Sequence, residues 1–555
     1  MNSKRRRHLL LLLVICGIVF GFRISSQDFW GRHGEARRAE VSREMVVSGN
    51  WAVPHLNGEP FITKPPLYYW AAALMFTLTG TFDELSARLP SMISGTLGVL
   101  ITYLWGSAMF SSRIGLFAGI ILATNFLYGG MARSAEVDMM LTLFTTSSLY
   151  FFSLGEHRFH AETQGMSRPF PYFVLSAICI ALGTLTKNPI GLAVPLLAIV
   201  VYLLLTRQVN LFIAAKPWWL VLVFLIVVLP WFVTVYTRVP DFFGVLYQET
   251  LGRYTNPAGT PHKEPLYYYL PALGAFAPWI MFFPGVLFSS WRACRQRPLS
   301  RDHLFVAAAF AVTFLLFSSV GSKREYYLLP LYPFLAILTA KYWDEYLRAR
   351  ATSHDRWMWR AMSWPLAGFA GLLVILGMSL PIASRLFLPQ YSGMSVIFGP
   401  AFILGGVFLF RTFSRGRVMH TFAFYTGTTV LLYVFVLLTI VPEMNRYRSR
   451  QEFFQEAARI AGGRQVVDYH YEGYAAQFYM QRIVPVVKKA DELETLVRSE
   501  QQPLFIIIKS GHYEKLRQEN PELAAHFEIV LAREWTSATN PHRKKRLLLV
   551  ASKRI

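Results

Sequence analysis

The chain has 555 residues, of which 54% are hydrophobic and only 16% are charged, and its mean hydropathy is +0.34. A water-soluble protein of this size does not carry so apolar a composition, so we expect the chain to lie in a membrane. Its formal net charge of +22 suits nucleic acid, anionic lipid or a phosphorylated substrate as a partner. The cysteines Cys16, Cys179 and Cys294 show neither Cys-x-x-Cys nor Cys/His metal spacing, which argues against disulfides and a thiolate zinc site.

The N-terminal segment begins with four basic residues, Lys4 to Arg7, and continues as an apolar run from Leu9 to about Phe22. Because no clear cleavage site follows and many apolar segments come later, we expect an uncleaved helix with a cytoplasmic N-terminus. Residues 23–66 then form the first outer loop, with a surface helix from about Glu35 to Val47. Residues 67–79 are too short to cross roughly 30 Å of hydrocarbon and are expected to be a re-entrant or interfacial helix.

Later apolar segments are long enough to be spans. They are expected at about 88–110, 114–130, 137–155, 171–186, 188–206, 217–236, 266–290, 303–320, 326–343, 362–383, 396–410 and 420–441. With the first helix, the sequence predicts an all-α polytopic membrane domain of about thirteen transmembrane helices over residues 1–441. This count places the Arg-rich loops in the cytoplasm, in agreement with the positive-inside rule, whereas a crossing at 67–79 would move every later basic cluster outside.

The last 114 residues differ in kind from the rest. Short β-like runs at Gln465 to Tyr469, Leu504 to Ile508, Ile529 to Leu531 and Arg546 to Val550 alternate with polar helical stretches such as Ala490 to Arg498. We therefore expect a small soluble α/β domain at residues 442–555. The odd number of spans puts this domain on the outer, periplasmic side.

Once the basic loops are assigned to the cytoplasm, most remaining ionisable residues near span ends fall on the outer side. They are Glu35, Arg37, Lys64, Arg133, Glu136, Asp138, Lys187, Glu249, Arg253, His262, Lys263, Lys323, Arg324 and Glu325. A charge costs about 2.5–3.5 kcal/mol near mid-bilayer and less toward the surface, so such a gathering needs a reason. Snorkelling anchors and local salt bridges explain any one residue as well as a binding site does, but they explain the whole set less well.

Several members of this set have a local context that suits phosphate or acid chemistry. Lys64 precedes Pro65 and Pro66, which hold it on a rigid corner, although it could equally be an interfacial anchor. Asp138 begins a span, where capping of the helix is the alternative to a catalytic role. Lys187, between two spans, and Lys323, in a turn, could hold a phosphate or diphosphate.

Five ordered groups of motifs between the first helix and about residue 335 resemble the membrane glycosyltransferases of the aminoarabinose transferase and protein O-mannosyltransferase family. They are Glu35-Ala36-Arg37 with Arg43-Glu44-Met45; Ser48 to Trp51 with Pro54 to Pro60; Lys64 to Trp70; Arg133 to Asp138; and Lys323 to Pro330 with Tyr332-Pro333. The resemblance implies the GT-C fold and transfer of a sugar from a polyprenyl (undecaprenyl) phosphate to a lipid or glycan acceptor. It also implies that the reaction takes place at the periplasmic face of the bacterial inner membrane. The expected sugar is 4-amino-4-deoxy-L-arabinose, and the expected acceptor is lipid A.

By the same resemblance, Glu35 and Asp138 are the expected catalytic acids. The positions expected to bind the donor phosphate are Lys64, Lys187, Arg253, His262 and Lys323. A divalent metal ion held by Asp138 and His262 is left open, and no other cofactor is expected. Two departures stand out: Gly34-Glu35 replaces the family's Asp-Glu, and Thr63 replaces the glutamate before Lys64, so Glu35 itself is the expected base.

Three rival functions remain at this point. Within the enzyme class, the chain could transfer another sugar to lipopolysaccharide core or to protein. A flippase or transporter for a lipid-linked sugar would also hold a basic cavity, but it predicts internal pseudo-symmetry and charges near mid-span. Binding of nucleic acid is not expected, because the basic residues are split between both faces and no recognition module occurs.

Overall fold

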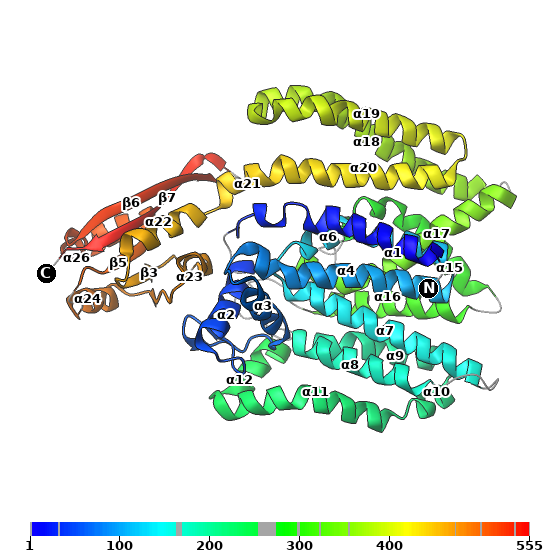
Figure 1. Cartoon of the computed structure of the whole chain (residues 1–555), viewed down its shortest axis with the longest axis horizontal. Coiled ribbons are helices and arrows are strands. Elements are labelled where there is room, and N and C mark those ends of the chain that lie inside the picture. The colour runs from blue at the N-terminus through cyan, green and yellow to red at the C-terminus, as the bar shows by residue number, and fades with distance from the viewer. Residues whose placement is uncertain are drawn as a thin grey trace. The chain divides into compact units, whose positions relative to one another are not determined.

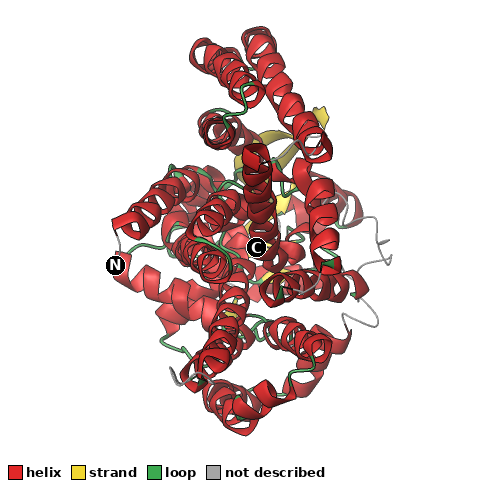
Figure 2. Ribbon diagram, turned by 90° about the vertical axis from the view of Figure 1, so that its right-hand side faces the viewer, coloured by secondary structure: helices red, strands yellow, loops and turns green. Residues whose placement is uncertain are grey.

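The computed structural model describes residues 3–30, 34–162, 169–252, 273–296, 300–320, 323–352, 356–471, 473–499, 502–537 and 540–553. The chain forms two compact units. The first unit contains Met1–Phe22, Thr63–Tyr68 and Pro90–Val436, and the second contains Arg23–Ile62, Tyr69–Leu89 and Leu437–Ile555. Helices dominate the described chain and strands are few, as Figure 2 shows.

The first unit consists of helices. In chain order they are α1 (Ser3–Cys16), continued by the π-helical turn Gly17–Gly21, α4 (Glu84–Met109, from Pro90 onward), α5 (Ser112–Ala123), α6 (Phe126–Ala132), α7 (Val137–Glu162), α8 (Phe170–Thr186), α9 (Ile190–Thr206), α10 (Val209–Ala214), α11 (Pro217–Arg238), α12 (Phe242–Tyr247), η3 (Gln248–Gly252), η5 (Trp279–Phe282), α15 (Phe283–Arg295), α16 (Arg301–Ser319), η6 (Glu325–Leu331), α17 (Tyr332–Thr352), α18 (Arg356–Phe387), η7 (Pro389–Tyr391), α19 (Ser392–Ser414) and α20 (Val418–Leu438). In Figure 1, α18 and α19 lie side by side as a hairpin joined by η7.

Eight helices among the described residues are long and apolar enough to cross a membrane, and a ninth span results if α5 and α6 count as one. The chain is therefore a multi-pass membrane protein, and the expected all-α membrane domain is confirmed. The count of thirteen stays a prediction. The expected spans at 171–186 and 188–206 are 17-residue helices, and the expected span at 266–290 lies partly outside the described residues.

The expected span at 114–130 is broken in the structure, where α5 and α6 meet at an angle of 68°, and whether the pair crosses the membrane as one span stays a prediction. The break occurs at Asn125, whose side-chain oxygen accepts a hydrogen bond of 2.8 Å from the Tyr128 N–H and so caps α6. The Phe126 and Leu127 N–H groups donate to the carbonyls of Ala277 and Ala275. The backbone N–H groups that would have continued α5 thus find carbonyl partners outside this helix, so the chain can bend inside the bundle without unpaired donors at these two residues.

Glycines bring α8 and α9 together where the chain turns between them. A Cβ atom on Gly191 would lie 2.1 Å from the Gly183 carbonyl carbon, so only glycine permits this approach. The short connection at 187–189 is consequently fixed by two closely packed helices. This turn carries Lys187.

The second unit begins with α2 (Glu35–Ser48), a hairpin of β1 (His55–Leu56) and β2 (Glu59–Pro60), and most of α3 (Leu67–Thr79). Both helices have almost the bounds that the sequence predicts. The unit continues with α21 (Ile440–Arg448), α22 (Gln451–Ala461), β3 (Val466–Tyr469), α23 (Tyr474–Met480), β4 (Val486–Val487), α24 (Ala490–Ser499), β5 (Phe505–Lys509), α25 (Ser510–Glu519), α26 (Pro521–Ala525), β6 (Phe527–Ser537) and β7 (Asn540–Ser552).

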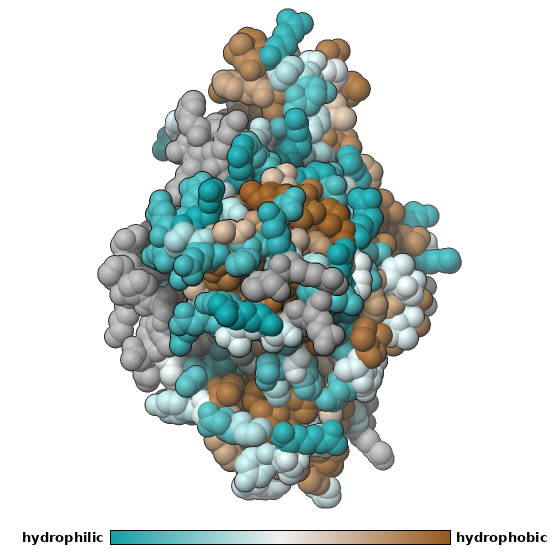
Figure 3. All heavy atoms as spheres, turned by 90° about the vertical axis from the view of Figure 1, so that its left-hand side faces the viewer, coloured by the Kyte–Doolittle hydropathy of each residue, from teal (hydrophilic) through white to brown (hydrophobic). Residues whose placement is uncertain are grey.

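The strands after residue 465 form one five-stranded sheet in the order β4-β3-β5-β7-β6. Strand β3 pairs in parallel with β4 and β5, while β7 pairs antiparallel with β5 and β6. Ile506, Ile508, Leu548 and Val550 are buried in its core, which explains the apolar runs seen in the sequence. The expected α/β character of this region is confirmed, whereas the domain boundary at residue 442 stays a prediction. Figure 3 shows a face on which hydrophilic side chains are mixed with smaller hydrophobic patches.

Candidate active site

A buried ion pair joins the start of α7 to the turn after α8. The Lys187 Nζ donates a hydrogen bond of 2.6 Å to the Asp138 Oδ1, and only 2% of the Asp138 side chain and 12% of the Lys187 side chain are exposed. The sequence predicted a functional role for both residues but could not pair them. A buried carboxylate and ammonium remain ionised when each neutralises the other, so the pair is a charged centre inside the first unit.

Aromatic side chains of η6, and the arginine that precedes it, complete this centre. The Lys187 Nζ lies 4.2 Å from the centroid of the Tyr327 ring, a cation–π contact that favours the ammonium. Burial opposes the charge of Lys187, but Asp138 and Tyr327 outweigh it, so the pKa of Lys187 is raised. The Nη1 of Arg324, the residue before η6, donates to the Tyr326 hydroxyl at 2.8 Å and adds a second cation beside this short helix.

Lys64 makes a separate ion pair within the first unit. Its Nζ lies 2.7 Å from the Glu249 Oε2 and 2.9 Å from the carbonyl oxygen of Thr63. The exposed fractions are 14% for the Lys64 side chain and 18% for that of Glu249, so neither is a fully solvated surface group. Glu249 lies on η3, which ends immediately before the undescribed residues 253–272. The expected phosphate ligands Arg253 and His262 fall in that range, outside the described residues.

Lys323 donates to the Val320 carbonyl at 2.8 Å and so caps the end of α16 in this structure. Among the described residues, no group of three or more His, Cys, Asp or Glu could hold a metal ion. The open question of a metal between Asp138 and His262 is therefore untested. In the described part of the chain, Lys187 supplies the positive charge next to Asp138.

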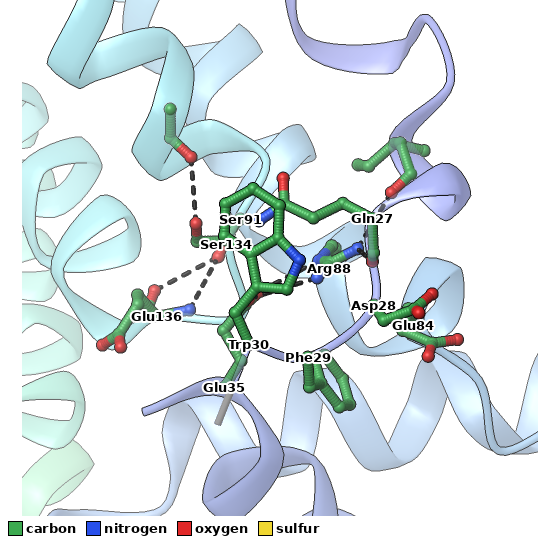
Figure 4. Close-up of polar contacts among 12 residues, drawn as sticks. Gln27, Asp28, Phe29, Trp30, Glu35, Glu84, Arg88, Ser91, Ser134 and Glu136 are labelled. Carbon is green, nitrogen blue, oxygen red and sulfur yellow. Dashed lines mark hydrogen bonds and ion pairs between the residues drawn. The ribbon is translucent and has the colours of Figure 1, made fainter. Parts of the chain in front are cut away.

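Glu35 belongs to the second unit, where it holds a buried arginine. The Glu35 carboxylate accepts hydrogen bonds of 2.9 Å from the Arg88 Nε and 3.1 Å from the Arg88 Nη2. The Arg88 side chain is fully buried, and its Nη1 donates to the carbonyls of Ile24 and Gln27 (Figure 4). This bidentate contact anchors the segment after the first helix through a carboxylate of that same segment. The role of Glu35 as the catalytic base stays a prediction, and in this structure its carboxylate is engaged by Arg88.

Sequence reasoning did not single out Arg88, although an arginine at the head of an apolar span was the available signal. It also grouped Arg133 with the outer charges. The structure shows that the Arg133 Nη1 donates to the carbonyls of Val19, Phe20 and Phe22, which lie at the end of the first helix. Arg133 therefore satisfies carbonyls that have no partner within that helix. The sequence did not predict the contact of Ser91 either: its hydroxyl donates to the Glu136 carbonyl at 3.1 Å (Figure 4).

Known proteins resemble this chain in sequence and in fold. The family of dolichyl-phosphate-mannose-protein mannosyltransferases matches residues 63–233. An undecaprenyl phosphate-alpha-4-amino-4-deoxy-L-arabinose arabinosyl transferase of Erwinia tasmaniensis is 30% identical over 340 residues, which cover 61% of this chain and 59% of that relative. A protein of the same name from Serratia proteamaculans is 26% identical over 82% of this chain and 80% of its own. Crystalline ArnT from Cupriavidus metallidurans bound to undecaprenyl phosphate has a TM-score of 0.78 at 24% identity and covers 98% of this chain and 97% of its own.

This chain has the fold of that membrane transferase, the GT-C fold. The GT-C fold is confirmed over nearly the whole chain, including the C-terminal sheet. An archaeal oligosaccharyltransferase from Archaeoglobus fulgidus shares it more distantly, with a TM-score of 0.53 at 11% identity over 96% of this chain and 74% of its own. The chain matches about three fifths of the length of the first curated relatives, 59% and 60% for the Erwinia and Proteus mirabilis proteins. The GT-C assignment therefore establishes the architecture in which the Asp138–Lys187 pair is set.

Proposed function

We propose that this chain transfers a sugar from a polyprenyl phosphate to a lipid or glycan acceptor. The preferred reaction is transfer of 4-amino-4-deoxy-L-arabinose from undecaprenyl phosphate to lipid A. The observation that supports it best is the buried Asp138–Lys187 pair against Tyr327, set in a GT-C fold. The names of the curated relatives supply the choice of sugar and lipid carrier.

The reaction forms a bond from the acceptor oxygen to the anomeric carbon and breaks the bond from that carbon to the donor phosphate. The acceptor proton passes to a carboxylate, and the polyprenyl phosphate leaves with the bonding electrons. Asp138 is suited to orient or deprotonate the acceptor, because its carboxyl group lies 2.6 Å from the Lys187 Nζ at the start of α7. The growing negative charge on the phosphate requires preorganised cations, for which Lys187 and Lys64 are the described candidates.

Both lysines are bound to carboxylates before a donor arrives: Lys187 to Asp138 and Lys64 to Glu249. In the proposed cycle, the donor phosphate takes over part of each lysine's hydrogen bonding, and the two carboxylates are released to interact with the acceptor. This exchange couples donor binding to activation of the acceptor. Arg253, His262 and Lys323 stay candidate phosphate ligands, and Glu35 stays a candidate base. Its contact with Arg88 favours a structural role instead.

The proposed location is the bacterial inner membrane, with the N-terminus in the cytoplasm and residues 442–555 in the periplasm. This orientation follows from the distribution of basic loops in the sequence. A divalent ion held by Asp138 and His262 stays a proposal, which turnover with and without a chelator tests. Transfer of another sugar to lipopolysaccharide core or protein is the nearest alternative, and a flippase for the same donor is the alternative of another class.

The test uses full-length protein purified in detergent. It is incubated with a panel of polyprenyl-phosphate sugars and with lipid A, core oligosaccharide or an acceptor peptide, and product masses are followed. The proposal predicts that lipid A gains one aminoarabinose residue only when the undecaprenyl-phosphate donor is present. Another donor–acceptor pair would identify the alternative transferase. Movement of intact donor across a liposome membrane, without any new covalent product, would refute the enzyme and support the flippase.

A further inference from the structure

A second site is visible in the first unit at the helices α8, α9, α10 and α11. They enclose a cavity with a volume of about 420 Å³. Its lining is apolar except for Ser176, and the Ser176 hydroxyl already donates to the Ser148 carbonyl at 2.8 Å. The cavity therefore offers a ligand almost no hydrogen bonds. Its volume lies within the range of about 300–1,000 Å³ that is typical of ligand pockets.

The cavity opens where side chains face the bilayer. Three of its lining residues, Leu196, Phe212 and Val221, are 44%, 51% and 54% exposed. The neighbouring Trp218 is 82% exposed, and tryptophan at the end of a span marks the interface between hydrocarbon and headgroups. An apolar chain of a membrane lipid can therefore enter the cavity while the polar end of the same lipid stays at the interface.

The mouth of the cavity at that interface is basic. Lys216 stands between the lining residues Ala215 and Pro217, and its Nζ lies 5.4 Å from the centroid of the Phe170 ring. The Arg158 guanidinium lies 5.9 Å from the centroid of the Tyr172 ring, and Tyr172 precedes the lining residue Phe173 in the chain.

Arg207 adds a third cation, because it ends α9 four residues after the lining residue Leu203. All three basic side chains are exposed. The nearby Glu156 is buried and accepts hydrogen bonds from the Tyr202 hydroxyl and the Gln208 amide. A second carboxylate near this end of α7, Asp302, is bound to His157 at 2.7 Å. Among the described residues, the three exposed cations are thus set against carboxylates that already have partners.

We propose that this cavity binds an anionic glycerophospholipid of the surrounding bilayer. An acyl chain fills the space between α8, α9 and α11, and the phosphate lies among Arg158, Arg207 and Lys216. A basic pocket between transmembrane helices is the usual recognition element for anionic headgroups. Because the site involves none of the residues proposed for sugar transfer, it is a separate lipid site of the protein. Phosphatidylglycerol carries the required charge, and phosphatidylethanolamine is the matched lipid without net charge.

The test measures retained lipid by native mass spectrometry. Full-length protein is reconstituted in nanodiscs of phosphatidylethanolamine with a minor fraction of phosphatidylglycerol and a trace of undecaprenyl phosphate. It is then released with its bound lipids. We expect bound phosphatidylglycerol to be enriched over its share of the bilayer. The double variant R158Q/K216Q should lower this enrichment roughly 10- to 30-fold, since each cation near the headgroups contributes about one factor of five.

The control is R415Q/R417Q, which removes two exposed basic residues between α19 and α20, away from the cavity lining. It should leave the enrichment unchanged. The variant A215F fills the cavity and should reduce both retained phospholipids, provided that it elutes as a single species on size exclusion. Equal enrichment in the parent and in R158Q/K216Q would overturn the proposal. Retention of undecaprenyl phosphate in place of phosphatidylglycerol would overturn it as well, because the cavity would then bind a polyprenyl chain.

Discussion

Replacement of Asp138 by asparagine separates the structural and chemical roles of the buried ion pair. Asparagine keeps the shape of the side chain but leaves the Lys187 ammonium, 12% exposed, without its carboxylate at 2.6 Å. Removal of one partner from a buried ion pair typically costs about 3–5 kcal/mol, so D138N should lower the thermal midpoint of the purified protein. Loss of the proposed acid–base group should also lower turnover by roughly 10²–10⁴.

A second variant distinguishes these two effects. D138N/K187M also removes the Lys187 ammonium, so no buried charge is left without an opposite charge beside it. This double variant should therefore recover most of the thermal stability that D138N loses. Its turnover should stay at or below that of D138N, because both proposed groups are gone. The assays are a thermal melt in detergent and sugar transfer followed by product mass. If D138N melts earlier but turns over within twofold of the parent, the pair is structural only and the proposed role of Asp138 is wrong.

Three further predictions follow from individual contacts. K64A should lower kcat/KM for the donor by roughly 10- to 100-fold, because a hydrogen bond to a charged group contributes about 1.5–3 kcal/mol. K64R keeps the positive charge and should retain part of the parent's kcat/KM. Equal kcat/KM values for K64A and the parent would remove Lys64 from the phosphate site. E35Q should lower the thermal midpoint by more than E59Q, which changes an exposed residue, since Arg88 loses its bidentate carboxylate. Unchanged melting of E35Q would show that the Arg88 contact is dispensable. Asp83 precedes α4 and accepts hydrogen bonds of 2.8 Å from the Ser86 N–H and the Thr81 hydroxyl. Burial raises the pKa of Asp83, but these hydrogen bonds outweigh burial and lower it. The contribution of Asp83 to the free energy of unfolding is therefore present above about pH 4 and is lost as the pH falls through the lowered pKa. D83A should therefore cost about 1 kcal/mol at pH 7 and less at pH 3. D83N also lacks the titrating carboxylate, so its stability difference from the parent should shrink over the same pH range.

Local sequence patterns predicted the elements of this fold well. The expected outer helix from Glu35 to Val47 corresponds to α2 (Glu35–Ser48), and the apolar segment 67–79 is α3 with the same bounds. These elements depend on periodicity and on flanking glycine or proline, which are readable within a few residues. The two-residue strand β4 was not predicted, because its pairing with β3 depends on a partner elsewhere in the chain.

The pairings at the candidate site could not be read from local patterns. Lys64 and Glu249 are 185 residues apart, and Asp138 and Lys187 are 49 apart. The sequence identified Lys64, Asp138 and Lys187 as unusual charges near span ends but gave no distances between them. The sequence likewise does not reveal the partner of Glu35, because Arg88 lies 53 residues away. Only the structure shows that the Glu35 carboxylate is bound to it.

The proposed transfer reaction requires that Lys64 and Asp138 face the same side of the membrane, and labelling of single cysteines tests this most directly. Cys16, Cys179 and Cys294 are replaced by alanine, and a single cysteine is introduced as T63C, next to Lys64, or as S134C, four residues before Asp138. An impermeant maleimide is then applied to intact spheroplasts and to inverted vesicles. We predict that both positions react in spheroplasts and are protected in inverted vesicles. Reaction of the two positions from opposite sides would contradict the proposed site, because no single donor could then reach both.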